Sequence, residues 1–406
     1  MLAHMAPVLS RPAIFLLLAS TLIGGSALSL NAQTGDEQPP ITDPTAVPTP
    51  TRRPSTGPYR AASPEYGMHL FTMGTPDATD RDLGKLNALR FGWQKSMFRW
   101  REIQPQRDVF FWDDADALVQ ASNAAGVKVI ARLDSTPSWA RSGTGNDGPP
   151  NNFADWDAFV FAFVDHYKPD SPYGTVDAVE LWNEPNLDRE WGGGTIDRPA
   201  ALRYVNLLCT GYRAAKRANP DVVTISAALS PTGTKNGRAM DDVVYLGWLY
   251  EGGMKPCFDV LGAHGVGYKA PPWISPQELA TNKQWGGDAS FGFRRVEQLR
   301  QVMERNGDAS KQIWLTEFGW TSDSIHQSYS WHRVSEQDKA EYIVQAFRFA
   351  ATNWRPWIGV MVLWNMPAPD WTEAREEYWW SITNPDGTTR PAYDRLLRER
   401  TSGSLP

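Results

Sequence analysis

The feature that most constrains the fold is a regular alternation, between residues 66 and 399, of short apolar runs with longer segments of helical periodicity. The runs lie at residues 66–71, 92–98, 128–133, 177–182, 222–229, 258–264, 312–318 and 359–364. Helical patterns between them include 113–126, 201–220 and 335–353. Eight strand-and-helix units predict a (β/α)8 barrel. An open doubly wound sheet is the alternative, but no glycine-rich phosphate-binding loop follows the first run.

The N-terminal region differs in composition from the rest of the chain. Arg11 precedes an apolar run at 13–30, and small residues follow it, so residues 1–32 are predicted to be an export signal. The run is also near the minimum length for a membrane span, so an uncleaved segment would tether the protein. Residues 33–65 are rich in Pro and Thr and are predicted to be an extended linker. We therefore expect a secreted or extracytoplasmic protein with one folded domain at 66–399.

Composition narrows the class of ligand. The net charge of -6 argues against a nucleic-acid surface, and 19 Trp exceed what a core needs, which favours a groove for flat ligands such as sugars. Cys209 and Cys257 either form one disulfide in an exported chain or remain two buried thiols. His326 and His332 are too far apart for a metal-ligand pair. Neither a metal nor another cofactor is expected.

Polar and aromatic residues follow several of the predicted strands. Glu184 and Asn183 come after the fourth strand in ELWNEPNL, Glu317 ends the seventh, His264 the sixth and Trp364 the eighth. In a barrel of parallel strands these ends meet at one mouth, where the chemistry of such folds takes place. Hydrolysis of a glycoside needs one protonated and one ionised carboxyl group on either side of the anomeric carbon. The two glutamates fit that requirement.

The motifs carry a family resemblance. ELWNEPNL followed by WLTEFGWTS resembles clan A retaining glycoside hydrolases, which are (β/α)8 barrels with catalytic residues after strands four and seven. Family 39 is the nearest, because DREWGG follows the first motif and TPSWAR follows the third strand; family 5 is next. The likeness spans residues 66–395, including ITNPDGTTRPAYDRL near its end.

The resemblance implies a role for each matching residue. Glu184 would be the general acid/base and Glu317 the nucleophile. Asn183 would bind the 2-hydroxyl of the sugar at the cleavage point, an interaction that strengthens in the transition state. Trp364 would lie beneath that sugar, and His264 matches the family's strand-six histidine.

Two positions depart from the family pattern. Relatives carry an Arg on strand two that keeps the nucleophile ionised, and here either Lys95 or Arg99 could take its place. A cation of either kind would lower the pKa of the nucleophile. Tyr268 lies one or two residues beyond the usual strand-six tyrosine, and we list it among the residues expected to bind substrate.

Other candidates have equally good structural explanations. His69 could reach the mouth but is better explained as a core residue, and Asp134 is expected to hold Arg132 or Lys95. Several indoles fall in predicted loops above the mouth, and some should be sugar platforms. They are Trp139, Trp191, Trp285, Trp320 and Trp371. We include Trp139 among the residues expected to bind substrate.

The sequence thus predicts an exported, monomeric retaining glycosidase that cleaves a β-linked polysaccharide or oligosaccharide. The sequence leaves open whether cleavage is within the chain or from an end, although the many Trp residues favour cleavage within the chain. The pKa of Glu184 should be raised by nearby negative charge, and Glu317 should stay ionised. One alternative is a cell-surface carbohydrate-binding protein that keeps the barrel without catalysis. A metal-dependent hydrolase would need His and Asp ligands at several strand ends, and only His69 and His264 are candidates.

Overall fold

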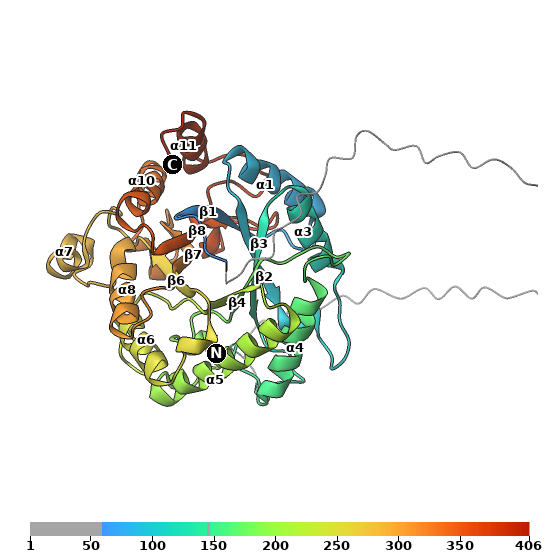
Figure 1. The fold of residues 1–406 in the computed structure, drawn as a ribbon. Helices are drawn as coiled ribbons and strands as arrows, with labels where there is room; N and C mark the ends of the chain where they lie inside the picture. Colours follow the sequence, from blue (N-terminus) through green and yellow to red (C-terminus); the bar gives the residue numbers. More distant parts are fainter. Residues whose placement is uncertain (1–58, 144–146, 406) are drawn as a thin grey trace, which may run out of the picture. The chain divides into compact units, whose positions relative to one another are not determined.

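The strands form one parallel sheet that curls into a barrel (Figure 1). In the computed structural model, residues 59–143 and 147–405 are described, so the predicted export signal and most of the predicted linker lie outside them. The strand order is β5-β4-β3-β2-β1-β8-β7-β6. A parallel bridge between Ile225 and Val260 joins β5 to the residue before β6 and closes the ring. The (β/α)8 prediction is confirmed.

All eight predicted runs became strands, with small differences at their ends. The strands are β1 (Glu65–Leu70), β2 (Trp93–Arg99), β3 (Lys128–Asp134), β4 (Ala178–Leu181), β5 (Val223–Ser226), β6 (Leu261–Val266), β7 (Ile313–Gly319) and β8 (Ile358–Met366). Their side chains are buried almost throughout, because the sheet has the barrel interior on one face and helices on the other.

Helices surround the sheet (Figure 1). They are α1 (Pro76–Ala88), α2 (Trp100–Ile103), α3 (Asp113–Ala124), α4 (Phe153–His166), α5 (Arg198–Ala218), α6 (Asp242–Glu251), α7 (Pro276–Thr281), α8 (Val296–Arg305), α9 (Gln327–Ser330), α10 (Glu336–Asn353) and α11 (Pro391–Thr401). The short 3-10 helices are η1 (Asp188–Glu190), η2 (Lys255–Cys257), η3 (Lys283–Trp285), η4 (Phe293–Arg295) and η5 (Glu376–Trp380). Helix α5 begins earlier than predicted, because the Asp197 side chain caps it by accepting a hydrogen bond from the Ala200 amide.

The core has two parts. A large cluster fills the space between strands and helices, and a smaller one fills the lower interior of the barrel around Trp93 and Trp314. Residues of the predicted linker belong to this smaller cluster: Ala61 is buried in it, and the Tyr59 ring packs against Trp93 at 5.8 Å between centroids. The folded domain therefore includes residues 59–65, which corrects the predicted boundary. At the other end Leu405 is buried, beyond the predicted limit of 399.

Cys209 and Cys257 form a disulfide that joins α5 to η2. The sequence left open whether these residues form a disulfide or remain two buried thiols, and the structure has the disulfide. Within residues 59–143 and 147–405, no helix is long and apolar enough to cross a bilayer. The same residues contain no group of His, Cys, Asp and Glu side chains arranged to hold a metal ion.

Candidate active site

An irregularity in β7 turns Glu317 toward the interior of the barrel. The register of β7 against β8 shifts between Leu315 and Phe318, and both of these residues belong to the outer core cluster. Thr316 points inward, since its Oγ1 donates to Glu180 Oε1 at 2.7 Å. In a regular strand Glu317 would then point outward. The bulge places Thr316 and Glu317 on the same inner face.

Four nitrogens approach one oxygen of Glu317. Its Oε1 lies 3.0 Å from Lys95 Nζ, 3.3 Å from Arg132 Nη1, 3.6 Å from His69 Nδ1 and 3.7 Å from His264 Nε2. The pKa of His69 is well below its usual value, because the ring is fully buried and faces these cations. His69 therefore contributes no positive charge, and the cations nearest Glu317 are Lys95 and Arg132.

The structure shows which of the two predicted cations, Lys95 or Arg99, lies beside Glu317. Lys95 is fully buried and also pairs with Glu180, at 2.8 Å. Arg99 lines the cleft but donates to Glu102 at 3.1 Å and makes no contact with Glu317. Arg132, on β3, is a second cation at Glu317 that sequence reasoning missed; its Nε also lies 2.8 Å from Asp134, as expected.

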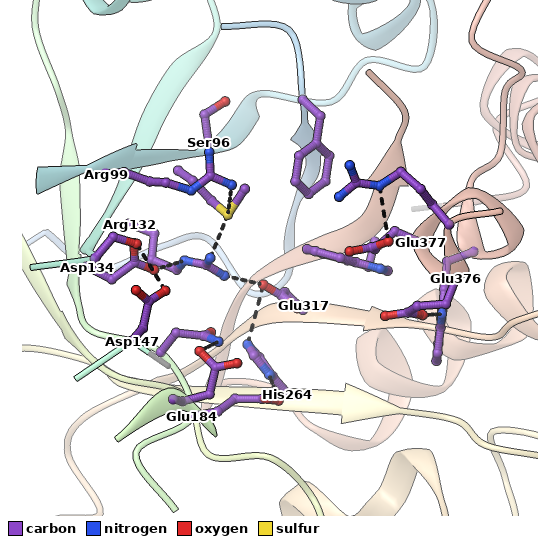
Figure 2. A pocket seen from close by; sticks show the side chains of 18 of the residues that line it. Ser96, Arg99, Arg132, Asp134, Asp147, Glu184, His264, Glu317, Glu376 and Glu377 are labelled. Atoms are coloured by element: carbon purple, nitrogen blue, oxygen red, sulfur yellow. Dashed lines mark hydrogen bonds and ion pairs between the residues drawn. The ribbon is translucent and has the colours of Figure 1, made fainter. Parts of the chain in front are cut away.

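Glu184 follows β4 across the mouth from β7, and His264 stands between the two carboxylates (Figure 2). His264 Nδ1 lies 2.9 Å from Glu184 Oε1, while its Nε2 faces Glu317. Glu184 Oε2 accepts a hydrogen bond from Arg189 Nη2 at 3.2 Å. If Glu184 served only to stabilise the fold, an ion pair with Arg189 would be expected, and this pair is present. Glu184 also lines the open cleft, which a purely structural role does not explain.

The pKa of Glu184 departs from our expectation. Burial alone would raise it, but the hydrogen bond and charge of His264, together with Arg189, lower the pKa to about 2. Burial likewise disfavours a charged His264, yet Glu317 and Glu184 outweigh it and raise the pKa of His264. In the substrate-free protein the pair therefore carries its proton on the imidazole. The prediction of a raised pKa for Glu184 was wrong because it did not anticipate two cationic partners.

Aromatic side chains form one wall of the cleft. Trp364 lines it and meets the rings of His69 and Phe71 edge-on, at 4.6 and 5.2 Å between centroids. Phe71 in turn packs against Trp371, which also lines the cleft. Of the five loop indoles considered, Trp371 is the one that does so.

Trp139 lies outside the cleft, which corrects its predicted role. Its Nε1 donates to the backbone oxygen of Gln104 at 2.9 Å, and its ring packs edge-on against Trp100. The guanidinium of Arg107 covers the ring at 4.5 Å. Trp139 therefore packs a loop, with Arg107 over its ring, and does not line the cleft.

Tyr268 lines the cleft, but its hydroxyl is already occupied. It donates to the backbone oxygen of Pro231 at 2.5 Å, and the ring packs against Phe291 and His332. Burial raises the pKa of Tyr268. The residue therefore shapes the wall and has no role as an acid.

The cleft has a volume of about 1290 Å³, larger than the usual pocket for a drug-sized ligand. Two aromatic side chains on its rim are largely exposed: Phe111, between β2 and α3, at 62%, and Trp331, between β7 and α10, at 44%. Neither was singled out from the sequence, because both lie in loops without a periodic pattern. They widen the aromatic surface available to a ligand.

No family model and no curated protein sequence matches this chain. Solved structures do resemble it. A family 39 glycoside hydrolase from the gut symbiont Bacteroides cellulosilyticus WH2 has a TM-score of 0.59 at 17% identity, covering 83% of this chain and 63% of that chain. A glucosidase from Croceicoccus marinus has a TM-score of 0.60 at 13% identity, covering 85% of this chain and 69% of that chain.

A third structure, GH5_18 from Streptomyces cattleya in complex with GlcNAc, has a TM-score of 0.58 at 14% identity and covers 84% of this chain and 81% of that chain. These likenesses establish the fold. The barrel is one shared with glycoside hydrolases of families 39 and 5, so the resemblance read from the motifs is confirmed at the level of the fold. This chain spans less than two thirds of the family 39 structure's length.

Proposed function

We propose that this protein is an exported retaining glycoside hydrolase that cleaves a β-linked polysaccharide or oligosaccharide. The observation that carries the proposal is the pair of carboxylates at one mouth, Glu184 after β4 and Glu317 on β7, on either side of His264. Double displacement needs two carboxyl groups beside the anomeric carbon, one that attacks it and one that passes a proton to the leaving oxygen. The disulfide supports export, because such bonds persist in oxidising compartments.

In the first half reaction Glu317 attacks the anomeric carbon. Its Oε1 is held by Lys95 and Arg132, so Oε2 is the attacking oxygen. The leaving oxygen takes its proton from Glu184, and that proton comes from His264 Nδ1 along the 2.9 Å hydrogen bond. The glycosidic bond breaks as the bond between Glu317 and the sugar forms.

In the second half reaction water attacks the glycosyl ester on Glu317. Glu184, which is ionised, accepts the proton of that water and passes it to His264 Nδ1 along the same 2.9 Å hydrogen bond, which restores the starting state. The ester bond breaks and Glu317 regains its charge beside Lys95 and Arg132. Two displacements at one carbon retain the anomeric configuration.

The cleft favours a chain of sugars over a single one. Phe111 and Trp331 on its rim and Trp371 in its wall offer rings against which successive sugars could stack. This supports cleavage within a glycan. The solved structures of similar fold include an exo-β-1,4-mannosidase and an endo-β-1,4-xylanase, so fold alone selects no sugar.

The test is turnover of a panel of β-linked glycans and aryl β-glycosides by the full chain, with product anomers followed by NMR. Glu184→Gln and Glu317→Gln should each lose on the order of 10³-fold or more in kcat. Glu304→Gln, a carboxylate on α8 that pairs with Arg300, is the matched control and should retain activity.

Rescue of Ala variants by azide distinguishes the acid/base role proposed for Glu184 from the nucleophile role proposed for Glu317. Added to Glu184→Ala it should yield the β-glycosyl azide, because the nucleophile is intact; added to Glu317→Ala it should yield the α-azide. If the protein binds glycans without turnover and the Gln variants bind as tightly, it is a carbohydrate-binding protein and the mechanism is wrong.

A further inference from the structure

Two loops that contact each other contribute to the wall of the cleft. The first, which we call the α9 loop, joins β7 to α10 over residues 320–335 and contains α9. The second, the η5 loop, follows β8 over residues 367–380 and ends in η5. Trp331 of the α9 loop and Trp371 of the η5 loop both line the cleft. The shape of the cleft therefore depends on how the two loops are held together.

The loops are joined at two places. At the first, the backbone amide and the Oγ of Ser322 donate to the Trp379 backbone oxygen, at 3.2 and 3.0 Å. Lys339, on α10, donates to the same oxygen at 2.9 Å. At the second, His326 Nε2 lies 3.0 Å from the backbone oxygen of Ala374. This second contact depends on the protonation of a histidine.

Both ring nitrogens of His326 face oxygens that accept hydrogen bonds. Its Nε2 faces the Ala374 backbone oxygen, and its Nδ1 lies 2.7 Å from Asp323 Oδ2. The Asp323 side chain is fully buried, and its Oδ1 accepts from the amides of Ile325 and His326, at 2.9 and 3.0 Å. A neutral imidazole carries one N–H, so only the imidazolium can donate to both oxygens.

We propose that His326 is a pH-sensitive clamp: its imidazolium ties the α9 loop to the η5 loop, and this part of the cleft wall loosens when the ring loses its proton. The neutral ring keeps its one N–H for Asp323, because a buried carboxylate without a donor costs more free energy than an exposed backbone oxygen without one. The bond that is lost is therefore the one to Ala374. The inference does not depend on the proposed function, because it concerns the shape of the cleft and not its chemistry.

The charged groups that act on the ring favour the clamped form. The hydrogen bond with Asp323 raises the pKa of His326, the backbone oxygen at Nε2 adds to this, and the charge of Glu376 on the η5 loop acts in the same direction. Arg375, also on the η5 loop, pairs with Glu377 at 3.5 Å. The clamp should therefore be complete below the usual histidine pKa of about 6.5 and be released as the pH rises through the raised value.

Two substitutions separate the two contacts of the ring. In His326→Gln the side-chain NH₂ group is as far from the backbone as Nε2 and can donate to Ala374 at every pH. In His326→Asn it is only as far as Nδ1 and can donate to Asp323 alone. The measurement is hydrogen–deuterium exchange of the full chain at about pH 5.5 and about pH 8.5, with the exchange rates of η5-loop peptides divided by the intrinsic rates at each pH.

Protection of the η5 loop in the parent should fall about 3- to 10-fold from the lower to the higher pH, because one hydrogen bond is lost. In both variants protection should be independent of pH, and in His326→Asn it should be lower than in the parent at the lower pH. NMR of the imidazole protons, with the His326 signal identified by its absence from His326→Gln, should show titration above about pH 6.5.

Two other groups at these loops titrate in the same range, so His326→Gln also serves as the control for them. Burial raises the pKa of Glu376, which hydrogen-bonds to Tyr329 of the α9 loop, to about 7, and burial lowers the pKa of Lys339 to about 8. An equal fall in protection in the parent and in His326→Gln would assign the pH dependence to these groups and overturn the clamp. So would full protection in His326→Asn, or a pKa of His326 at or below about 6.5.

Discussion

The two ends of the barrel surround their charged groups differently. At the floor, formed by the N-terminal ends of the strands, Glu65 accepts hydrogen bonds from Trp93 Nε1 at 2.6 Å, the Tyr59 hydroxyl at 2.7 Å and the Ala62 amide at 2.8 Å. Lys128 Nζ donates to the Tyr59 hydroxyl and lies over the Trp93 ring. A charge at the floor is surrounded by partners that belong to the protein.

At the mouth, formed by the C-terminal ends, several buried polar atoms have no hydrogen-bond partner. They are Asn183 Oδ1, His264 Nε2 and both ring nitrogens of His69. Cations and carboxylates are crowded there, and their pKa values move in opposite directions. The floor also has an unpartnered buried atom, Trp314 Nε1, so the contrast lies in the charged groups. At the floor the charge of Glu65 is matched within the protein, whereas at the mouth charged groups lie beside several unpartnered atoms in an open cleft. Substitutions at the two ends should therefore have different consequences.

Lys95, buried beneath the mouth between Glu180 and Glu317, should give the largest effect, because it serves both stability and the site. Lys95→Met leaves Glu180 buried without a cation and should cost about 3–5 kcal/mol of unfolding free energy. It should also lower kcat/KM at least about 100-fold, since Glu317 loses its nearest cation. Urea unfolding and steady-state kinetics measure the two effects.

The double variant Lys95→Met/Glu180→Gln sharpens this result. It removes the stranded carboxylate, so most of the stability should return while the activity does not. If activity returns as well, Lys95 acts only by neutralising Glu180, and the contact with Glu317 is incidental.

Trp314 tests the floor. It is fully buried and packs edge-on against Trp93 at 5.1 Å between centroids. Trp314→Ala should destabilise the protein by about 3–5 kcal/mol through the cavity it leaves. The kcat/KM of the folded fraction should stay within a factor of two.

Trp331, an exposed indole at the mouth, is the counterpart of Trp314. Trp331→Ala should have the reverse effect: it should weaken activity on polymers, while the free energy of unfolding changes by less than about 0.5 kcal/mol.

The smallest predicted effect is on the pH dependence of kcat/KM. The pair formed by His264 and Glu184 keeps its proton while the pH is below the raised pKa of His264, and loses it as the pH rises through that value. The kcat/KM should therefore fall on the alkaline side. His264→Gln should move this basic limb down by about one pH unit or more, because the proton must then reside on Glu184 alone. An unmoved basic limb would show that His264 does not supply the proton.

The sequence predicted the fold and the pair of carboxylates at the mouth for different reasons. Eight apolar runs separated by helical patterns leave few ways to bury both faces of a sheet, so the barrel follows from periodicity and count. Once the barrel is assumed, residues that follow strands must meet at its mouth. That reasoning placed Glu184, Asn183, His264 and Trp364 in one cleft, and the structure has them there.

Other residues could not be placed in this way. Trp139 and Phe111 both lie in loops, yet one packs a loop and the other lines the cleft, and no local pattern distinguishes them. Lys95 and Arg99 lie four residues apart on one strand, and only the path of β2 and its following turn decides which of them meets Glu317. Loop conformation and side-chain packing decide which of these residues reach the cleft. Neither follows from a periodic pattern in the sequence.

What the amino-acid sequence determined by itself is the order of strands and helices and the chemical types at the strand ends, because both depend on local periodicity. What only the tertiary structure decided is the environment of each group. The bulge at Thr316 turns Glu317 inward, η1 brings Arg189 and Glu190 against Glu184 and Asn183, and His264 stands between the two carboxylates. Charge interactions depend on distances of a few ångströms across the barrel, which no spacing along the chain specifies.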